Sequence, residues 1–196
     1  MGFIEDARRK QIVNAAIAVL AREGYANASL SRIAQEAGIS KSIITYHFSG
    51  KDEMFEAVYR HVEASAGAHI TPYMEDADGP AGRIAAYIRH QIGYMKGHRD
   101  ELLAIGHLAM SHGGPNGPDY IAASEDEEIA LLEDMMAVGQ ELGVFRQFVR
   151  RVMAAAIAKA IESALTEWAW RPETDLDAYA DELIALFERG MRKDGP

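Results

Sequence analysis

The chain has 196 residues, of which 48% are hydrophobic and 26% charged, a balance typical of a globular protein that buries a sizeable core. The absence of cysteine excludes disulfides, thiolate metal sites and cysteine nucleophiles, and it fits a reducing cytosol. The net charge of −10 is unevenly placed: residues 1–51 hold seven Lys and Arg against four Asp and Glu, a charge of +3, and the remainder carries −13, so the first fifty residues are the candidate segment for an anionic partner.

The first ten residues, MGFIEDARRK, mix acids with bases and precede no apolar run. We therefore expect no signal peptide. No stretch approaches the roughly 18 uninterrupted apolar residues that a membrane-spanning helix needs. The expected location is the cytoplasm, without membrane contact.

The first helix is predicted from one apolar stripe and is expected to end at Gly24. The stripe contains Ile12, Ala15, Ala16, Val19 and Leu20. Ser29 is placed to cap a second helix, LSRIAQEA, which Gly38 ends. Ser40 is placed to cap a third helix over residues 41–48.

Ser49 is expected to cap a fourth helix that begins at Lys51 and ends at Pro72. Further helical patterns follow over about 81–97, 99–111, 120–142, 145–169 and 175–192. The sequence shows no alternating strand pattern, repeat or low-complexity tract. The predicted fold class is all-α.

The third predicted helix has two unlike sides. Ile44 and Phe48 lie on one side. The other side presents Lys41, Ser42, Thr45 and Tyr46. A helix ending at Gly38, a few residues earlier, suits a helix-turn-helix, whose second helix enters the major groove of DNA. Lysine can reach guanine acceptors or a phosphate, and the two hydroxyls can donate or accept. A capped helix with a solvated face explains the same pattern.

Residues 8–62 resemble the N-terminal domain of the TetR family of transcriptional regulators. The resemblance lies in IVNAAIAVLAREGY, in SLSRIAQEAGIS, and in YHF followed by Lys51 and an amphipathic helix. LGVFR at 142–146 also resembles the boundary before the family's penultimate helix. The resemblance implies a three-helix DNA-binding domain over 1–50, and a helical effector-binding and dimerisation domain over 51–196 whose helix at about 51–72 is the connector.

The same resemblance implies the residues that contact DNA. Base contacts fall on Lys41, Ser42 and Thr45. Backbone contacts fall on Ser29, Ser31, Tyr46, His47 and Lys51. Thr45 stands where the family most often has tyrosine, and its shorter side chain covers less base surface, so a relative's operator preference does not transfer. Ile43 either touches a thymine methyl or packs.

Two long apolar stripes in the last third suggest an interface between two copies of the chain. The candidate dimerisation residues are Val149, Val152, Met153, Ala156, Ile157, Ala160, Ile161, Leu183 and Phe187. Many small side chains in the first stripe would let another helix approach closely. An intramolecular core is the alternative interpretation.

The middle of the chain offers candidate walls for an effector pocket, because methionine suits an adaptable apolar cavity and polar groups orient a ligand. These residues are Tyr87, Gln91, Tyr94, Met95, Met110, Met135 and Met136. Simple core packing explains them too. His90, His98, His107 and His112 lack the i, i+4 spacing of a helical metal site, so no metal is expected. The acidic run SEDEE at 124–128 is interpreted as a first-turn cluster.

The predicted function is a repressor that a small organic effector releases from a palindromic operator, without enzymatic activity or cofactor. Neither a nucleophile with its base, nor paired core carboxylates, nor a cofactor loop is evident, and the glycines at 113, 114 and 117 match no phosphate-binding pattern. Two alternatives stay open: a helical-bundle enzyme or small-molecule carrier without DNA function, and a DNA-binding dimer with no effector.

Overall fold

The described part of the chain, residues 3–112 and 119–193 of a computed structural model, consists of helices and one isolated bridge between Phe145 and Arg192. The predicted all-α class is confirmed. No helix in these ranges is long and apolar enough to cross a membrane. Contacts divide the chain into two compact units. Unit 1 is Met1–Ser65 with His98–Ile121, and unit 2 is Ala66–Gly97 with Ala122–Pro196.

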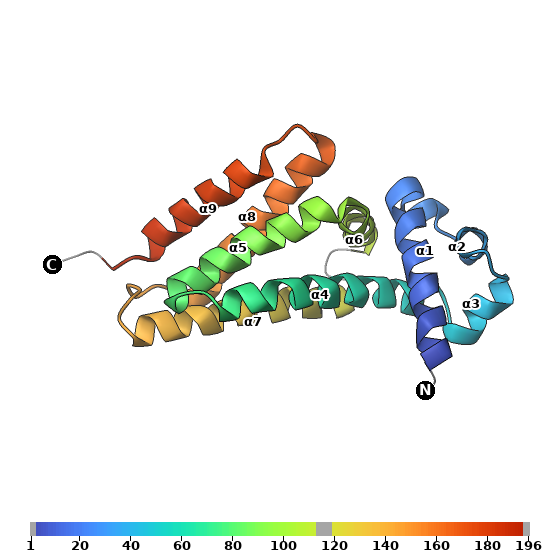
Figure 1. Ribbon diagram of the computed structural model, residues 1–196, viewed down its shortest axis with the longest axis horizontal. Coiled ribbons are helices and arrows are strands. Elements are labelled where there is room, and N and C mark those ends of the chain that lie inside the picture. The colour runs from blue at the N-terminus through green and yellow to red at the C-terminus, as the bar shows by residue number, and fades with distance from the viewer. Residues whose placement is uncertain (1–2, 113–118, 194–196) are drawn as a thin grey trace. The chain divides into compact units, whose positions relative to one another are not determined.

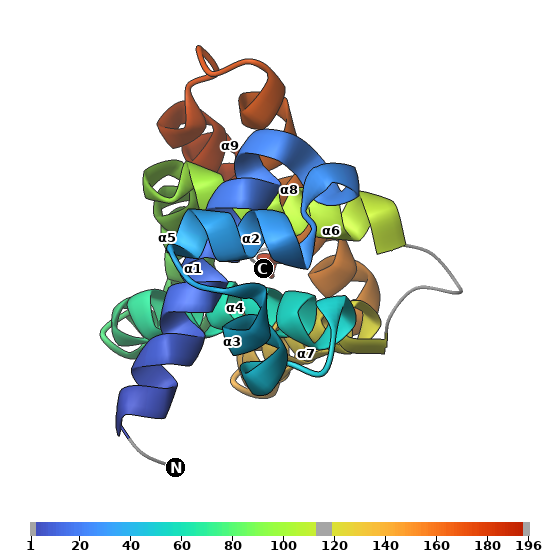
Figure 2. The same ribbon diagram turned by 90° about the vertical axis from the view of Figure 1, so that its right-hand side faces the viewer.

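Unit 1 is built from α1 (Phe3–Asn27), α2 (Leu30–Ala37), α3 (Lys41–His47), the first part of α4 (Lys51–Glu75) and α6 (Arg99–His112). Both α2 and α6 pack on α1, and Figure 2 shows α2 running across it. Apolar side chains from all five helices form the core of the unit. They include Ile12, Ala16, Leu20, Ile33, Ile44, Phe48, Phe55, Val58, Ala104 and Leu108.

Local signals in unit 1 fix the helix ends much as predicted. Gly24 interrupts α1 with φ 74°, and Gly38 ends α2 with φ 66°, backbone conformations that favour glycine. The Ser29 hydroxyl accepts the Arg32 backbone N–H at 3.2 Å and caps α2. The predicted side-chain cap at Ser40 is wrong, because its hydroxyl lies 2.7 Å from the Ser42 hydroxyl instead.

Unit 2 contains the later part of α4, α5 (Gly79–Gly97), most of α7 (Asp119–Glu141), α8 (Arg150–Trp170) and α9 (Leu176–Met191). Figure 1 shows α5, α8 and α9 side by side, and they contact one another along their lengths. Branched and aromatic side chains fill the core between the helices of this unit. They include Ile84, Ile88, Ile92, Leu132, Met136, Ile157, Ile161, Ile184 and Phe187.

Two predicted helix boundaries are wrong. Pro72 does not end α4, which continues to Glu75, and the Pro72 carbonyl accepts the Asp76 N–H at 3.0 Å. Proline removes one backbone donor from the helix, but here it lies in the last turn of α4 and the helix ends three residues later. The second error concerns α8, which begins at Arg150 and not at 145.

The link between α7 and α8 is held by tertiary contacts rather than by helix formation. The N–H of Phe145 donates to the Gly139 carbonyl at 3.0 Å, and the N–H of Arg146 donates to the Met191 carbonyl at 3.0 Å. The Phe145 ring lies where a side chain on Gly139 would be, so this position of α7 needs glycine. These contacts keep residues 145–149 out of the helix and connect the link to the end of α9.

The predicted domain border at residue 50 differs from the division into units. The first part of α4 groups with α1, α2 and α3, and so does α6, which the sequence placed in the body. The physical reason is packing along α1: buried Ala104 and Leu108 belong to α6, and His107 lies against Gly24. The border at residue 50 is what the family resemblance implies, and it stays a prediction about function rather than about packing.

Candidate nucleic-acid interface

The connection from α2 to α3 has the geometry of a helix-turn-helix. At the end of α2 the N–H of Gly38 donates to the Gln35 carbonyl at 3.2 Å, and the N–H of Ile39 donates to the Ala34 carbonyl at 3.0 Å. Three residues separate the end of α2 at Ala37 from the start of α3 at Lys41. The left-handed conformation at Gly38 turns the chain sharply enough for the two short helices to pack against each other.

α3 has one buried and one exposed side, as predicted. Ile44 and the following Phe48 are fully buried, whereas Lys41, Thr45 and Tyr46 are exposed, Tyr46 to 77%. Burying each apolar side chain stabilises the docked helix by roughly 1.5–3 kcal/mol. Ile43 is half-buried, so both of its interpretations stay open.

The hydroxyls of α3 are partly engaged within the helix. Thr45 Oγ1 donates to the Ser42 carbonyl at 3.1 Å, and the Thr45 side chain is exposed. Ser42 shares a hydrogen bond with Ser40. Next to α3, the exposed Ser29 and Ser31 lie at the start of α2, where N–H groups of a helix favour anions.

His47 and Lys51 mark the end of α3 and the start of α4. The half-buried His47 ring meets the Tyr46 ring edge-on at 5.1 Å between centroids. Lys51 Nζ donates to the Tyr25 carbonyl at 3.1 Å and lies 3.9 Å from the centroid of the Tyr25 ring. Burial lowers the pKa of the Lys51 ammonium. Lys51 therefore joins α4 to the end of α1, a contact that the sequence did not reveal.

Arg9 and Glu53 complete this region and were not predicted from the sequence. The Arg9 guanidinium donates to the His47 carbonyl and lies 4.1 Å from the centroid of the Phe48 ring. Its other nitrogen, Nη2, is 3.5 Å from Glu53 Oε1. Glu53 Oε2 accepts the Ser49 N–H at 2.7 Å, and this bond is the largest cause that lowers the pKa of Glu53.

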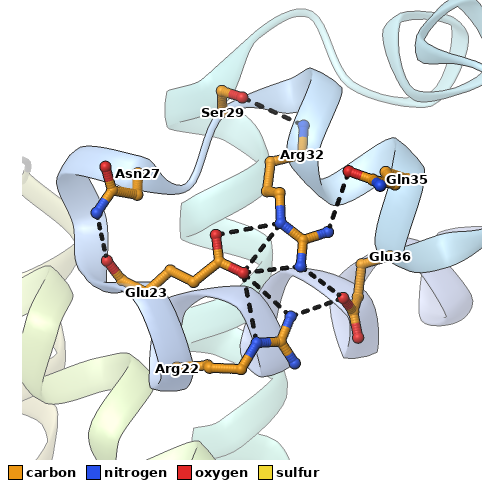
Figure 3. Close-up of polar contacts among 7 residues, drawn as sticks. All are labelled: Arg22, Glu23, Asn27, Ser29, Arg32, Gln35 and Glu36. Carbon is orange, nitrogen blue, oxygen red and sulfur yellow. Dashed lines mark hydrogen bonds and ion pairs between the residues drawn. The ribbon is translucent and has the colours of Figure 1, made fainter.

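Figure 3 shows an ion-pair network that joins α1 to α2. Arg32 Nη2 lies 2.7 Å from Glu23 Oε1 and 3.2 Å from Glu36 Oε2. Arg22 Nη2 lies 3.2 Å from Glu23 Oε1 and 2.7 Å from Glu36 Oε2. Hydrogen bonds from Arg32 and Arg22 lower the pKa of Glu23 and Glu36 respectively. The network holds α2, and with it the start of the helix-turn-helix, against α1.

The predicted effector residues are not all in one unit. Tyr87, Tyr94, Met95, Met135 and Met136 are buried in unit 2, and Gln91 is half-buried there. Met110 belongs to unit 1 and is 80% exposed. Met135 alone of these residues lines an open, mostly apolar hollow of about 230 Å³, whose other walls are Gly79, Pro80, Arg83, Val138 and Leu142. This volume is below the roughly 300–1,000 Å³ typical of ligand pockets.

A polar pair in unit 2, of which Tyr87 is buried and Glu128 half-buried, joins α5 to α7. The Tyr87 hydroxyl donates to Glu128 Oε1 at 2.5 Å. Burial is the main cause that raises the pKa of both groups, that of Tyr87 well above its ordinary value. The first-turn interpretation of residues 124–128 is wrong, because α7 begins at Asp119 and the acids lie beyond its first turn. Helical periodicity in the sequence did not predict that the Glu128 side chain contacts Tyr87 of α5.

The neighbouring acids of α7 pair with α8. Glu125 Oε1 lies 3.2 Å from Lys159 Nζ, and Asp126 Oδ1 lies 2.7 Å from Arg151 Nη2. These ion pairs are exposed, so each contributes little to stability. The two ion pairs direct the side chains of Glu125 and Asp126 toward α8.

The predicted dimerisation residues divide into exposed and buried sets. Val149, Val152 and Ala156 are exposed on or just before α8, Val152 to 67%. Met153, Ala160 and Leu183 are half-buried. Ile157, Ile161 and Phe187 are buried in the core of unit 2 and are therefore not among the exposed residues. The exposed Leu186, which the sequence did not single out, lies on α9 together with the exposed Tyr179 of the second apolar stripe.

The histidines considered for metal binding do not come together as a set. His90 stacks on Tyr73 with 3.6 Å between ring centroids, and burial lowers its pKa. His107 belongs to α6 and His98 precedes it. The side chain of His112 lies outside the described residues, among which no group of three or more metal-ligating side chains occurs.

Comparison with known proteins agrees with this geometry. Residues 12–58 match the family model of the bacterial regulatory proteins of the tetR family. The HTH-type transcriptional regulator BetI of Brucella suis biovar 1 is 33% identical over 85 residues, which cover 43% of this chain and 43% of that protein. The chain thus spans less than half of the length of the curated relatives it matches.

Solved structures extend the similarity of fold to both units. The fatty acid degradation regulator FadR from Bacillus halodurans is 20% identical, with a TM-score of 0.84 over 93% of this chain and 99% of that chain. A transcriptional regulator from Saccharomonospora viridis in complex with choline is 20% identical, with a TM-score of 0.82 over 96% of this chain and all of the other. At these identities the similarity is one of fold. The match to the bacterial regulatory proteins of the tetR family is thus confined to the N-terminal part of the chain, at residues 12–58.

Proposed function

We propose that the protein is a transcriptional regulator that binds double-stranded DNA as a homodimer and that a small organic effector releases it from a palindromic operator. The observation that carries the proposal is α3. It follows a helix-turn-helix bend, buries Ile44 and Phe48, and exposes polar side chains from its N-terminal turns. In helix-turn-helix proteins these N-terminal positions of the second helix contact base edges.

Each of the predicted DNA-contacting side chains has a role in this proposal. Lys41 donates to guanine acceptors, and Ser42 and Thr45 contact base edges with a hydroxyl or, for Thr45, its methyl group. Phosphates are contacted by the remaining predicted residues, which position the helix without reading sequence. These are Ser29, Ser31, Tyr46, His47 and Lys51.

The homodimer is supported by the exposed apolar surface of α8 and α9. Val149, Val152 and Ala156 are spaced at i, i+3 and i+7, and Leu186 on α9 is 61% exposed. Because α8 and α9 are adjacent, two copies of this surface would form a four-helix interface. A dimer places two α3 helices on half-sites about 34–36 Å apart.

The effector is proposed to bind in unit 2, where apolar side chains surround the Tyr87 and Glu128 pair. Methionines allow repacking around a ligand, and the polar pair supplies orientation. Two solved structures of similar fold differ in chemistry, because one is in complex with choline and the other is a regulator of fatty acid degradation. The fold therefore does not decide the effector.

Selection from random duplexes tests the proposal. The wild-type protein should enrich a palindrome and bind it with a strong dependence on salt, because phosphate contacts release counterions. Lys41→Ala and Thr45→Ala should change which sequences are enriched, at a cost of roughly 1–3 kcal/mol for the operator. A wild-type protein that enriches no sequence would contradict the proposal.

A further inference from the structure

We infer that Arg9 is a positioning residue for DNA recognition: it holds the C-terminal end of α3 and so sets the direction in which this helix presents its exposed side chains. The inference rests on the proposed function and names a residue that acts through α3 rather than on DNA. Three contacts of the Arg9 guanidinium carry it, with His47, Phe48 and Glu53.

α3 needs such support because it is short. It has seven residues, about half of the length at which isolated helices become even marginally stable. Its N-terminal end is joined to α2 through the turn at Gly38, and Ile44 anchors its middle. The last carbonyls of a helix have no partner within the helix. The C-terminal end of α3 must therefore be held from outside.

Arg9 supplies this support from α1. Its guanidinium donates to the carbonyl of His47, the last residue of α3, and brings a positive charge to the negative end of the helix dipole. The same planar group lies 4.1 Å from the centroid of the buried Phe48 ring. One side chain of α1 thus contacts both the last residue of α3 and the first residue after it.

Glu53 extends the support to the start of α4. It lies 3.5 Å from Arg9 Nη2 and accepts the Ser49 N–H at 2.7 Å. Residues 47–53 are therefore held at both ends by one connected set of bonds. A small rotation of α3 about Ile44 would break the bond at His47 and would displace Lys41 and Thr45 from the base edges.

The test uses a substitution that keeps the positive charge of Arg9 and removes its planar guanidinium group. Arg9→Lys retains the positive charge but cannot both stack its plane on Phe48 and donate in two fixed directions. Arg8→Lys is the matched control, because Arg8 is the adjacent residue of α1 and bonds Gln11 on its own helix at 2.6 Å. Circular dichroism checks that the variants fold. Glu53→Gln weakens the same support and replaces Arg9→Lys if that variant unfolds.

The first measurement needs no DNA. Amide hydrogen exchange at residues 45–49 should be about tenfold faster in Arg9→Lys than in wild type, because a charge-assisted hydrogen bond is lost. Arg8→Lys should exchange like wild type. Unchanged exchange in Arg9→Lys would overturn the inference, whatever the protein does with DNA.

The second measurement compares the operator selected by the wild-type protein with a random duplex of equal length. Arg9→Lys should lower operator affinity about tenfold and leave random-duplex affinity and the salt dependence near wild type, because its charge is retained. Equal losses on both duplexes would identify Arg9 as a phosphate contact instead. Wild-type operator affinity in Arg9→Lys would also overturn the inference, whereas a wild-type protein with no preferred sequence would contradict the proposed function itself.

Discussion

Basic side chains in unit 1 differ in how much of their charge is available to DNA. Arg22 and Arg32 are paired with glutamates, and Lys51 lies on the Tyr25 ring. Lys41 is exposed and forms no salt bridge with any residue that the structure describes. The charge of +3 indicates this segment as the candidate for an anionic partner, but counting residues cannot tell the paired bases from Lys41, because the pairs join residues far apart in the chain.

The contribution of Lys51 to DNA binding and to stability can be tested. Lys51→Ala should weaken binding to all duplexes to a similar degree and reduce the salt slope by about 1, if the ammonium also contacts a phosphate. It should in addition lower the melting temperature, because the Tyr25 carbonyl and ring lose their partner. Salt titrations of the operator and of a random duplex, with thermal unfolding, measure both effects. A lower melting temperature with an unchanged salt slope would leave Lys51 a purely structural role.

The Tyr87 and Glu128 pair predicts a pH-dependent stability. Because burial raises the pKa of Glu128 in the folded chain, the folded state binds this proton more tightly than the unfolded state does. The contribution of Glu128 to the unfolding free energy therefore falls as the pH rises from 4.5 through the raised pKa. Glu128→Gln should be more stable than wild type at neutral pH, and the gain should shrink as the pH falls toward 4.5.

Removing the other partner has the opposite effect. Tyr87→Phe leaves the half-buried Glu128 carboxylate without its donor and should lower the unfolding free energy by about 1 kcal/mol at neutral pH. The loss should be smaller where Glu128 is protonated. Urea unfolding across this pH range measures both variants, with Glu141→Gln at an exposed position of α7 as control. Parallel curves for Glu128→Gln and wild type would show that Glu128 does not titrate in this window.

At the scale of helices, the sequence predicts what local chemistry decides. Gly24, Ser29 and Gly38 act on backbone groups within a few residues, so the sequence predicts the break in α1 at Gly24 and both ends of α2, although α1 continues to Asn27. The start of α8 could not be predicted in this way, because contacts with Gly139 and with residues near 191 keep Phe145 out of the helix. Helical periodicity reports which side of a helix is apolar and says nothing of such distant partners.

The exposed surface of α8 and α9 gives a prediction at this scale. Val152→Glu with Leu186→Glu should give a folded monomer in sedimentation experiments, because both side chains are exposed within the single chain. Ile157→Glu should instead unfold unit 2, since it buries an unpaired carboxylate. Leu131→Glu, at an exposed position of α7, is the control and should stay dimeric. A double variant that still sediments as a dimer would place the interface elsewhere.

For the whole molecule, α4 is the element shared by the two units. Phe55 and Val58 are buried in unit 1, and Ile70, on the same helix, is buried in unit 2. A ligand that changes how unit 2 packs on α4 therefore acts on a helix that also belongs to the core of unit 1. The role of α4 as a connector is implied by the family resemblance and stays a prediction, and no local pattern in the sequence predicts that α6 groups with unit 1.

Reciprocal linkage tests this coupling. An effector that lowers operator affinity tenfold requires about 1.4 kcal/mol of coupling free energy, and operator DNA must then weaken effector binding tenfold as well. Titrating the protein with a candidate effector, first alone and then with saturating operator, measures the second factor directly. Equal affinities in the two titrations would describe a ligand-binding protein without a switch.

The contacts between the α7–α8 link and the end of α9 also have a consequence during synthesis on the ribosome. Unit 1 uses no residue beyond Ile121, whereas the backbone bond from Arg146 to Met191 and the bridge at Arg192 need the last helix. Chains leave the ribosome from the N-terminus, and domains generally fold as they emerge. The unit that carries α3 therefore has all of its residues while 122–196 are still being translated, and a nascent chain can fold this unit before it has the helices to pair with a second copy.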